Sequence, residues 1–319
     1  MMIFPGLMVF AALLAAAGLT APAALAAPRT ARLSAHPVVA LTFDDLPDGG
    51  GLSPDDTRTR IATALAATLK AHHLKGTYGF VNAVGVNDDP DLQQALRAWL
   101  AAGMNIGNHT WSHPSLSRVT AAAYERNIAQ DKPLLAAYAG ARDWHWFRYP
   151  YLEEGDTLAK RRAVRAWLGA HGYRIAQVTL NFNDDDWQDP YGRCLAQHNI
   201  AAIDWLEKSY LENAAEFIRV GREEEQIAFG HEIPNVLLLH ETAFTTLMLP
   251  RLLDQMHREG FRFKSLARVE QNRAYARDPD AALPDGGTLP NEYLNSRHLP
   301  YPPFTPEPVD QLNSLCTSQ

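Results

Sequence analysis

The chain has 319 residues and a net charge of −7 at pH 7, with 46% apolar and 20% charged residues. This apolar content is too high for intrinsic disorder, and the length suits one large or two ordinary domains. With 36 acidic and 29 basic residues, the chain lacks the basic excess typical of nucleic-acid binding. We therefore expect a folded, enzyme-sized protein with no nucleic-acid partner.

The first segment of the chain has the pattern of a secretory leader. Residues 1–27 carry no charged side chain, and the apolar run Leu7–Leu19 is followed by the small-x-small triplet Ala24–Ala26. We predict a signal peptide over 1–27, cleaved near Ala26 or Ala27, and a periplasmic or secreted protein with no membrane span after cleavage. The absence of Lys or Arg before the apolar run leaves a retained membrane anchor as the alternative.

After the leader, short apolar runs alternate with helical patterns, which is typical of βα units around a parallel sheet. The predicted strands are Pro37–Phe43, Gly76–Val81, Met104–Asn108, His145–Arg148, Arg174–Leu180, Asn235–His240 and Phe261–Phe263. The predicted helices are Thr57–His72, Pro90–Ala102, Ala121–Tyr138, Thr157–His171, Ile200–Arg219 and Phe244–Arg258. This alternation predicts an α/β protein with a distorted (β/α)7-type barrel.

The same pattern predicts the domain organisation. A single catalytic domain covers 34–270 and includes a mainly helical insertion at about 189–234, which is longer than one crossover requires. Residues 271–319 are rich in proline and predict an extended tail rather than a domain. Cys194 and Cys316 lack the close spacing of a metal or redox pair; in an oxidising compartment they could form a disulfide, or they could remain two thiols.

Ionisable residues follow several predicted strands directly. In a parallel βα architecture the carboxyl ends of the strands converge on one face, where catalytic groups gather. We therefore expect one cleft formed by the strand-end segments Thr42–Asp45, His109–His113, Arg148–Tyr151 and Leu238–His240.

His109 and His113 are four residues apart, so one helical turn would place both imidazoles on the same side. Two neutral imidazoles and one carboxylate leave an open position for water, as in a catalytic Zn²⁺ site, and Asp45 is the expected third ligand. Because successive side chains alternate on an extended backbone, Asp44 would point away from Asp45 and is free to accept a proton. For an isolated Asp-Asp pair, a turn or helix cap is the competing interpretation.

These motifs, in this order, resemble the polysaccharide deacetylases, the NodB-homology family of carbohydrate esterases (family 4). The family's five motifs correspond to Thr42–Asp45, His109–His113, Arg148–Tyr151, Asp186-Trp187 and Leu238–His240. They cover about residues 37 to 263. The resemblance implies a NodB-like deacetylase fold.

The resemblance also implies a metal site and a base. Asp45, His109 and His113 would hold one divalent ion, with Zn²⁺ favoured over Co²⁺ or Ni²⁺. Asp44 would be the catalytic base, and Arg148 would orient it and keep it ionised.

The remaining roles concern the acid and the substrate. His240 would protonate the departing amine, and Asp186 would tune His240. The backbone N–H of Tyr151 would bind the oxyanion, while Trp187 and Leu238 would form an apolar pocket for the acetyl methyl group.

The predicted function is therefore metal-dependent hydrolysis of the N-acetyl group of amino sugars in a poly- or oligosaccharide, such as peptidoglycan or a chitin-like glycan, with release of acetate. Two alternatives stay open. The chain could deacylate another small amide, such as one on a lipid-linked sugar, or it could bind a glycan without turnover. The sequence leaves the polymer, the metal and the oligomeric state unspecified.

Overall fold

The computed structural model describes residues 33–53 and 55–317. The predicted leader, residues 1–27, lies outside this part of the chain. Within the described residues, no helix combines the length and the apolar character needed to cross a membrane.

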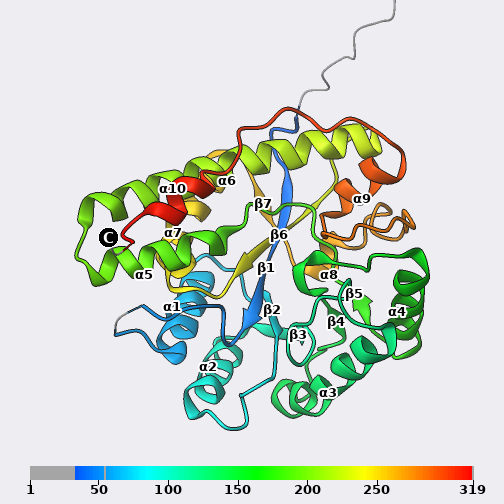
Figure 1. The fold of residues 1–319 in the computed structure, drawn as a ribbon, viewed down its shortest axis with the longest axis horizontal. Coiled ribbons are helices and arrows are strands. Elements are labelled where there is room, and N and C mark those ends of the chain that lie inside the picture. Colours follow the sequence, from blue (N-terminus) through cyan, green and yellow to red (C-terminus); the bar gives the residue numbers. More distant parts are fainter. Residues whose placement is uncertain (1–32, 54, 318–319) are drawn as a thin grey trace, which may run out of the picture. The chain divides into compact units, whose positions relative to one another are not determined.

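A parallel seven-stranded sheet forms the centre of the fold (Figure 1). Its strands are β1 (Val38–Leu46), β2 (Tyr78–Val81), β3 (Asn105–Asn108), β4 (Trp146–Phe147), β5 (Arg174–Ile175), β6 (Asn235–His240) and β7 (Arg262–Phe263). Six of them run in the order β5-β4-β3-β2-β1-β6, and β7 pairs with the start of β1. Because β1 and β6 are buried on both faces, their near-continuous apolar sequences are those of covered parallel strands.

The two ends of the sheet meet beyond β5. Leu180 forms a parallel bridge with Leu237 of β6, and the N–H of Leu238 donates to the carbonyl of Leu180. The predicted strand Arg174–Leu180 is therefore regular only at its first two residues and again at its last. This irregular closure confirms the predicted distorted βα barrel.

Helices surround the sheet on the outside (Figure 1). They are α1 (Arg58–Ala71), α2 (Pro90–Ala101), α3 (Ala121–Ala139), α4 (Leu158–Ala170), α5 (Gln188–Ala196), α6 (Ile200–Phe229), α7 (Ala243–Arg258), α8 (Leu266–Val269), α9 (Leu289–Ser296) and α10 (Val309–Ser314), with short 3₁₀ turns η1 (Pro150–Leu152) and η2 (Asp184–Trp187). Side-chain N-caps begin most of the long helices, as with Thr57 at α1 and Thr242 at α7.

The insertion is helical, as predicted, but its main helix is longer than expected. Helix α6 continues ten residues past Arg219 and ends only at Gly230, which adopts the left-handed conformation of a C-cap. The sequence pattern did not reveal this extension, because several residues on the buried side of its last turns are polar. Arg222 is one of them, and its Nε lies 2.8 Å from Glu232 Oε2.

The prediction of an extended C-terminal tail is wrong over α9 and α10. Thr288 and Asn291 form a capping box at the start of α9, with Pro290 in its first turn, where proline favours a helix start. Buried Tyr293 and Leu294 pack α9 against α6, and Arg161 of α4 lies 3.0 Å from Glu292. In Figure 1 the chain from α9 to α10 runs beside α6.

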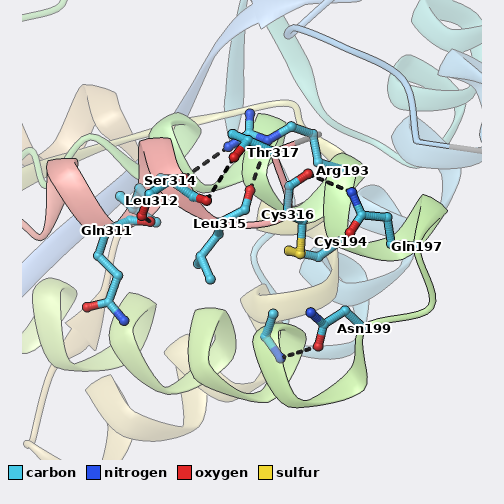
Figure 2. Close-up of a disulfide and its surroundings, with 11 residues drawn as sticks. Arg193, Cys194, Gln197, Asn199, Gln311, Leu312, Ser314, Leu315, Cys316 and Thr317 are labelled. Atoms are coloured by element: carbon cyan, nitrogen blue, oxygen red, sulfur yellow. Dashed lines mark hydrogen bonds between the residues drawn. A yellow bond between two sulfur atoms is a disulfide. The ribbon is translucent and has the colours of Figure 1, made fainter. Parts of the chain in front are cut away.

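A disulfide fixes the end of this segment. Cys194 of α5 and Cys316 are bonded, which resolves the alternative that the sequence left open (Figure 2). Around the bond, Arg193 donates to the carbonyls of Leu312 and Leu315, and Gln197 donates to that of Cys316. The C-terminal segment is therefore attached covalently to the insertion.

Candidate active site

The carboxyl ends of the strands open into a cleft of about 590 Å³. It is lined by five of the sequence-predicted residues with ionisable side chains, namely Asp44, Asp45, His109, His113 and His240. Residues of α6 and of the chain after 284 form its opposite side. The structure thus brings the predicted strand-end residues together, as expected for a parallel βα fold.

Asp45, His109 and His113 converge on one point. Asp45 Oδ1 lies 3.5 Å from Nε2 of His109 and 3.4 Å from Nε2 of His113, and the three ligand atoms lie within 4.8 Å of one another. Ligand atoms about 2.0–2.2 Å from a tetrahedral zinc ion are about 3.3–3.6 Å apart. The spacing therefore fits one small ion between the three side chains.

The chemistry of these donors also fits a metal. Asp45 Oδ1 is buried and accepts no hydrogen bond from the described residues, which is unusual for a buried carboxylate oxygen. Nδ1 of His109 lies 2.8 Å from the carbonyl oxygen of Arg148, so the proton sits on Nδ1 and Nε2 keeps its lone pair. Burial and the neighbouring His109 lower the pKa of His113 to about 4, which keeps that imidazole neutral.

The backbone around these ligands is unusual. Asp45, Thr110, His113 and Tyr151 all have positive φ, between 54° and 70°, a conformation that side chains other than glycine rarely adopt. Such strain gathers at functional sites that the surrounding fold holds in place.

His109 and His113 are brought together by a non-helical turn, in which the His113 N–H donates to Thr110 Oγ1. This agrees with Pro114, which disfavours helical geometry at His113. The expectation about β1 is wrong, because the left-handed Asp45 and a register irregularity after Phe43 break its side-chain alternation. As a result, both Asp44 and Asp45 face His109, with Asp44 Oδ2 3.7 Å from Nε2.

Asp44 is buried and held by Arg148. Nη1 of Arg148 lies 3.2 and 3.1 Å from the two oxygens of Asp44, Nη2 donates to Thr42 Oγ1, and Nε donates to the carbonyl of Ala176. The guanidinium also lies 4.6 Å from the ring centroid of Phe80. Arg148 is therefore fixed on several sides and orients the carboxylate of Asp44.

His240 has a different carboxylate partner from the one expected. Its Nδ1 lies 2.8 Å from Asp184 Oδ1 and 3.3 Å from Asp185 Oδ1, whereas Asp186 is exposed on η2. Asp184 is fully buried and also accepts from the His240 N–H and from Thr245 Oγ1. The carboxylate that contacts His240 most closely is therefore that of Asp184, two residues before the expected Asp186.

These carboxylates favour the protonated imidazole. Burial lowers the pKa of His240, but the charges of Asp185 and Asp184 outweigh it and raise the pKa well above its ordinary value. Asp184, Asp185 and His240 form a second group with metal-ligand spacing. Because the carboxylate of Asp184 already accepts several hydrogen bonds, this group is better described as an oriented acid than as a second metal site.

Of the predicted substrate-contacting residues, Tyr151 and Leu238 line the cleft. The ring of Tyr151 is 58% exposed and stands 4.4 Å from that of His113, measured between centroids. Trp187 does not line the cleft: it is fully buried, and its Nε1 donates to Ser209 Oγ of α6. The assignment of Trp187 to the acetyl pocket is therefore wrong.

Sequence reasoning also missed residues that complete the site. Thr245 orients Asp184, and Thr42 orients Arg148. Thr42 belongs to the first motif, so its position was available, whereas no pattern near Thr245 points to a partner 61 positions away in the chain.

Comparison with known proteins finds a family that is similar to part of the chain. The sequence profile of the polysaccharide deacetylases matches residues 34–176, a little under half of the chain. The matched segment contains β1 to β5 with the aspartate pair, the histidine pair and Arg148, and it confirms the resemblance seen in the motifs.

Curated relatives of the chain include two named deacetylases. A peptidoglycan-N-acetylglucosamine deacetylase from Bacillus cereus is 31% identical over 146 residues, which are 46% of this chain and 46% of the relative. Chitin deacetylase 1 from Cryptococcus neoformans is 27% identical over 200 residues, 59% of this chain and 40% of the relative. The chain thus spans less than half the length of these relatives.

Solved structures show the same fold. A CE4 family pseudoenzyme from Bacillus anthracis superposes with a TM-score of 0.50 at 15% sequence identity, covering 73% of this chain and 65% of that one. At this identity the likeness concerns the architecture alone, and it agrees with the distorted βα barrel described above.

Proposed function

We propose that this protein is a metal-dependent deacetylase that removes the N-acetyl group from amino sugars of a peptidoglycan or chitin-like glycan. The observation that carries the proposal is the convergence of Asp45, His109 and His113 beside an arginine-bound Asp44 and a carboxylate-bound His240. The names of the curated relatives support the same reaction class.

Asp45, His109 and His113 would hold the ion. Two imidazoles and one carboxylate suit Zn²⁺ best, with Co²⁺ and Ni²⁺ as substitutes. When bound, the ion would polarise the acetyl carbonyl and lower the pKa of a coordinated water. The free electron pairs on Asp45 Oδ1 and His109 Nε2 support this ligand set.

Asp44 would accept the proton of the attacking water. Its two oxygens share one guanidinium nitrogen of Arg148, and this pairing fixes the orientation of the carboxylate. The distance of 3.7 Å between Asp44 Oδ2 and His109 Nε2 keeps the base beside the ligand set. Arg148 therefore acts by positioning Asp44.

His240 would donate the proton to the departing amine. Asp184 binds Nδ1, which leaves Nε2 for the substrate, and the two neighbouring carboxylates favour the imidazolium that an acid requires. The backbone N–H of Tyr151 would stabilise the oxyanion, and Leu238 would contact the acetyl methyl group; both residues line the cleft.

The predicted periplasmic or secreted location belongs to the same proposal. The disulfide between Cys194 and Cys316 supports it, because structural disulfides persist mainly in oxidising compartments.

Acetate release tests the proposal. Purified protein is treated with a chelator, reloaded with Zn²⁺, Co²⁺ or Ni²⁺, and incubated with N-acetylglucosamine oligomers, peptidoglycan and acetylated xylan. We expect loss of acetate release on chelation, recovery on reloading, and preference for the amide substrates.

Two other outcomes distinguish the alternatives. Release of an acyl group only from lipid-linked amino sugars would favour the second deacylase interpretation. Glycan binding without acetate release from any substrate, at full metal occupancy, would show a binding protein without turnover.

A further inference from the structure

The cleft has two chemically different sides. Its strand-end wall consists of the residues at the ends of β1, β3 and β6, whereas its outer wall consists of the cleft-lining residues of α6 and of the segment 285–304. All residues of the outer wall lie outside the segment 34–176 that matches the family profile. The outer wall is therefore where this chain can select its own substrate.

The outer wall is built into the fold. Gly286 passes so close to the carbonyl oxygen of Tyr151 that a β-carbon would collide with it, and the N–H of Leu289 donates to Val178 O. Farther along, Asn291 Nδ2 donates to Glu224 Oε2 of α6 at 2.8 Å. The segment thus bridges from the Tyr151 turn to α6 and closes the cleft on that side.

This closure limits the substrate that can enter. A long polymer needs a groove that is open at both ends, whereas here the segment 285–291 lines the cleft and bridges from the Tyr151 turn to α6. A volume of about 590 Å³ falls in the range of pockets that hold one small ligand. The geometry therefore fits the end of a glycan chain better than its middle.

The rim of the outer wall carries exposed aromatic rings. Tyr301 and Phe304 are 51% and 53% exposed, although both line the cleft. Phe304 packs edge-on against Phe217 of α6, with centroids 6.0 Å apart, and the Tyr301 hydroxyl lies 3.5 Å from the carbonyl oxygen of Asn291. Both rings are thereby held while part of each surface stays open, and the C–H faces of sugar rings pack on such surfaces.

The charge of the cleft further limits the classes of glycan that can bind. Asp185 and Asp285 line it together with the aspartates of the strand-end wall, and among the described residues none that lines it is Lys or Arg. An anionic glycan would meet like charges here, whereas an uncharged or amine-bearing glycan would not.

We propose that the outer wall restricts this enzyme to the terminal residue of an uncharged or amine-bearing N-acetylhexosamine chain, with Tyr301 and Phe304 binding the neighbouring sugar. This proposal rests on the proposed function and names its substrate class.

The site of deacetylation tests the chain-end specificity. The metal-loaded protein is incubated with the hexamer of N-acetylglucosamine, and the modified position is mapped by mass spectrometry after labelling the reducing end. We expect the first deacetylated unit at one terminus. Deacetylation that begins at internal residues would overturn the proposal.

Variants at the rim test the aromatic contact. Tyr301→Ala and Phe304→Ala should each raise KM for the hexamer about three- to tenfold, as expected for the loss of one ring contact, with kcat nearly unchanged. Val309→Ala is the matched control, because Val309 is an exposed apolar residue of α10, just after the segment 285–304, and does not line the cleft. An unchanged KM in both alanine variants would contradict the role of the rim.

A charged probe tests the electrostatic part. The hexamer oxidised to carboxylates at C6 should have a kcat/KM at least tenfold below that of the neutral hexamer, and Asp285→Asn should reduce this difference. Equal turnover of the two hexamers would refute the selection by charge.

A binding measurement tests the outer wall independently of the proposed deacetylase activity. If no substrate releases acetate, calorimetric titration of the same protein with the neutral hexamer still compares the wild type with Tyr301→Ala and Phe304→Ala. Weaker binding by the variants would support the outer wall as a glycan site even though the function had failed. Equal binding would refute it.

Discussion

The two walls of the cleft are fixed in different ways. The strand-end wall holds Asp44, His109 and His240 by buried hydrogen bonds to Arg148 and Asp184, which leave each group a single orientation. The outer wall presents half-exposed rings on a segment attached through α6 and a disulfide. The comparison teaches that the groups proposed for the chemistry lie on a rigid sheet, while the groups proposed for substrate choice lie on added elements that can vary without disturbing it.

Substitutions in the strand-end wall should have the largest effect. We expect His109→Ala to lose both metal and activity, and Asp44→Asn to bind metal normally while activity falls about 10²- to 10⁴-fold, the usual contribution of a general base. Metal content by elemental analysis and acetate release measure the two effects. Equal loss of metal in both variants would overturn this division of labour.

Removal of the disulfide should weaken the outer wall selectively. The bond joins residues 122 positions apart, and in the chain-entropy account a loop of this length stabilises the fold by about 4 to 5 kcal/mol. We expect Cys194→Ser with Cys316→Ser to lower the free energy of unfolding by that order and to raise KM, while metal binding persists. Wild-type protein treated with a reductant is the control, and an equal loss of metal binding would show that the two walls are coupled.

The partner of His240 provides a sharper test within the strand-end wall. Because Asp184 binds Nδ1 of His240 and Asp186 is exposed, Asp184→Asn should lower kcat about 10- to 100-fold, whereas Asp186→Asn should change it less than threefold. In Asp184→Asn the imidazolium of His240 loses a stabilising negative charge, so its pKa falls. The decrease of kcat at alkaline pH should therefore begin at a lower pH than in the wild type. A larger loss of kcat in Asp186→Asn than in Asp184→Asn would instead support Asp186, the partner of His240 expected from the sequence.

The smallest effect concerns Glu224 of the outer wall, which accepts from Asn291 and lies near Tyr301. Burial raises the pKa of Glu224 to about 7. The folded protein therefore binds a proton more tightly than the unfolded chain, so the contribution of this group to stability is present below pH 4.5 and is lost as the pH rises toward 7.

Glu224→Gln removes this titration and should increase the free energy of unfolding at pH 8 by about 2 kcal/mol, with little change at pH 4.5. Thermal unfolding of both proteins across this range measures the difference. A constant difference between them at every pH would contradict the assignment.

The sequence was sufficient to predict the strand-end wall because its residues follow apolar runs directly. Asp45 lies near the carboxyl end of β1, His109 directly follows β3 and His240 ends β6, and parallel strands place such positions on one face. The backbone that aims them was not predictable: the left-handed Asp45 and His113 are imposed by surrounding contacts rather than by local propensity. For this reason the alternation argument for Asp44 failed although the residue was chosen well.

Three adjacent aspartates show a second limit. A local sequence pattern does not distinguish the adjacent residues Asp184, Asp185 and Asp186. The neighbouring Trp187 led to the choice of Asp186 as the aspartate of the Asp-Trp motif. In the structure Trp187 is buried against α6. Its position in the sequence therefore indicates a core contact and does not mark a residue of the cleft. Only the three-dimensional placement of His240 and Thr245 selects Asp184.

The outer wall was beyond prediction because it depends on distant contacts. Prolines in 271–319 suggested extended chain, but Pro290 starts a helix there, and burial against α6 supplies the stabilisation that composition does not reveal. Glu224 and Tyr301 are separated widely along the chain and meet only when α9 docks.

The late position of the segment 285–304 has a consequence for biogenesis. A ribosome completes the ligand set and His240 before it translates the chain that bounds the other side of the cleft. The residues proposed for the chemistry can thus come together before the segment 285–304 docks and Cys316 bonds to Cys194. If the proposed function holds, substrate selectivity would arise after the strand-end wall has formed, and proteolytic loss of the segment from residue 285 onward would widen the range of substrates rather than abolish acetate release.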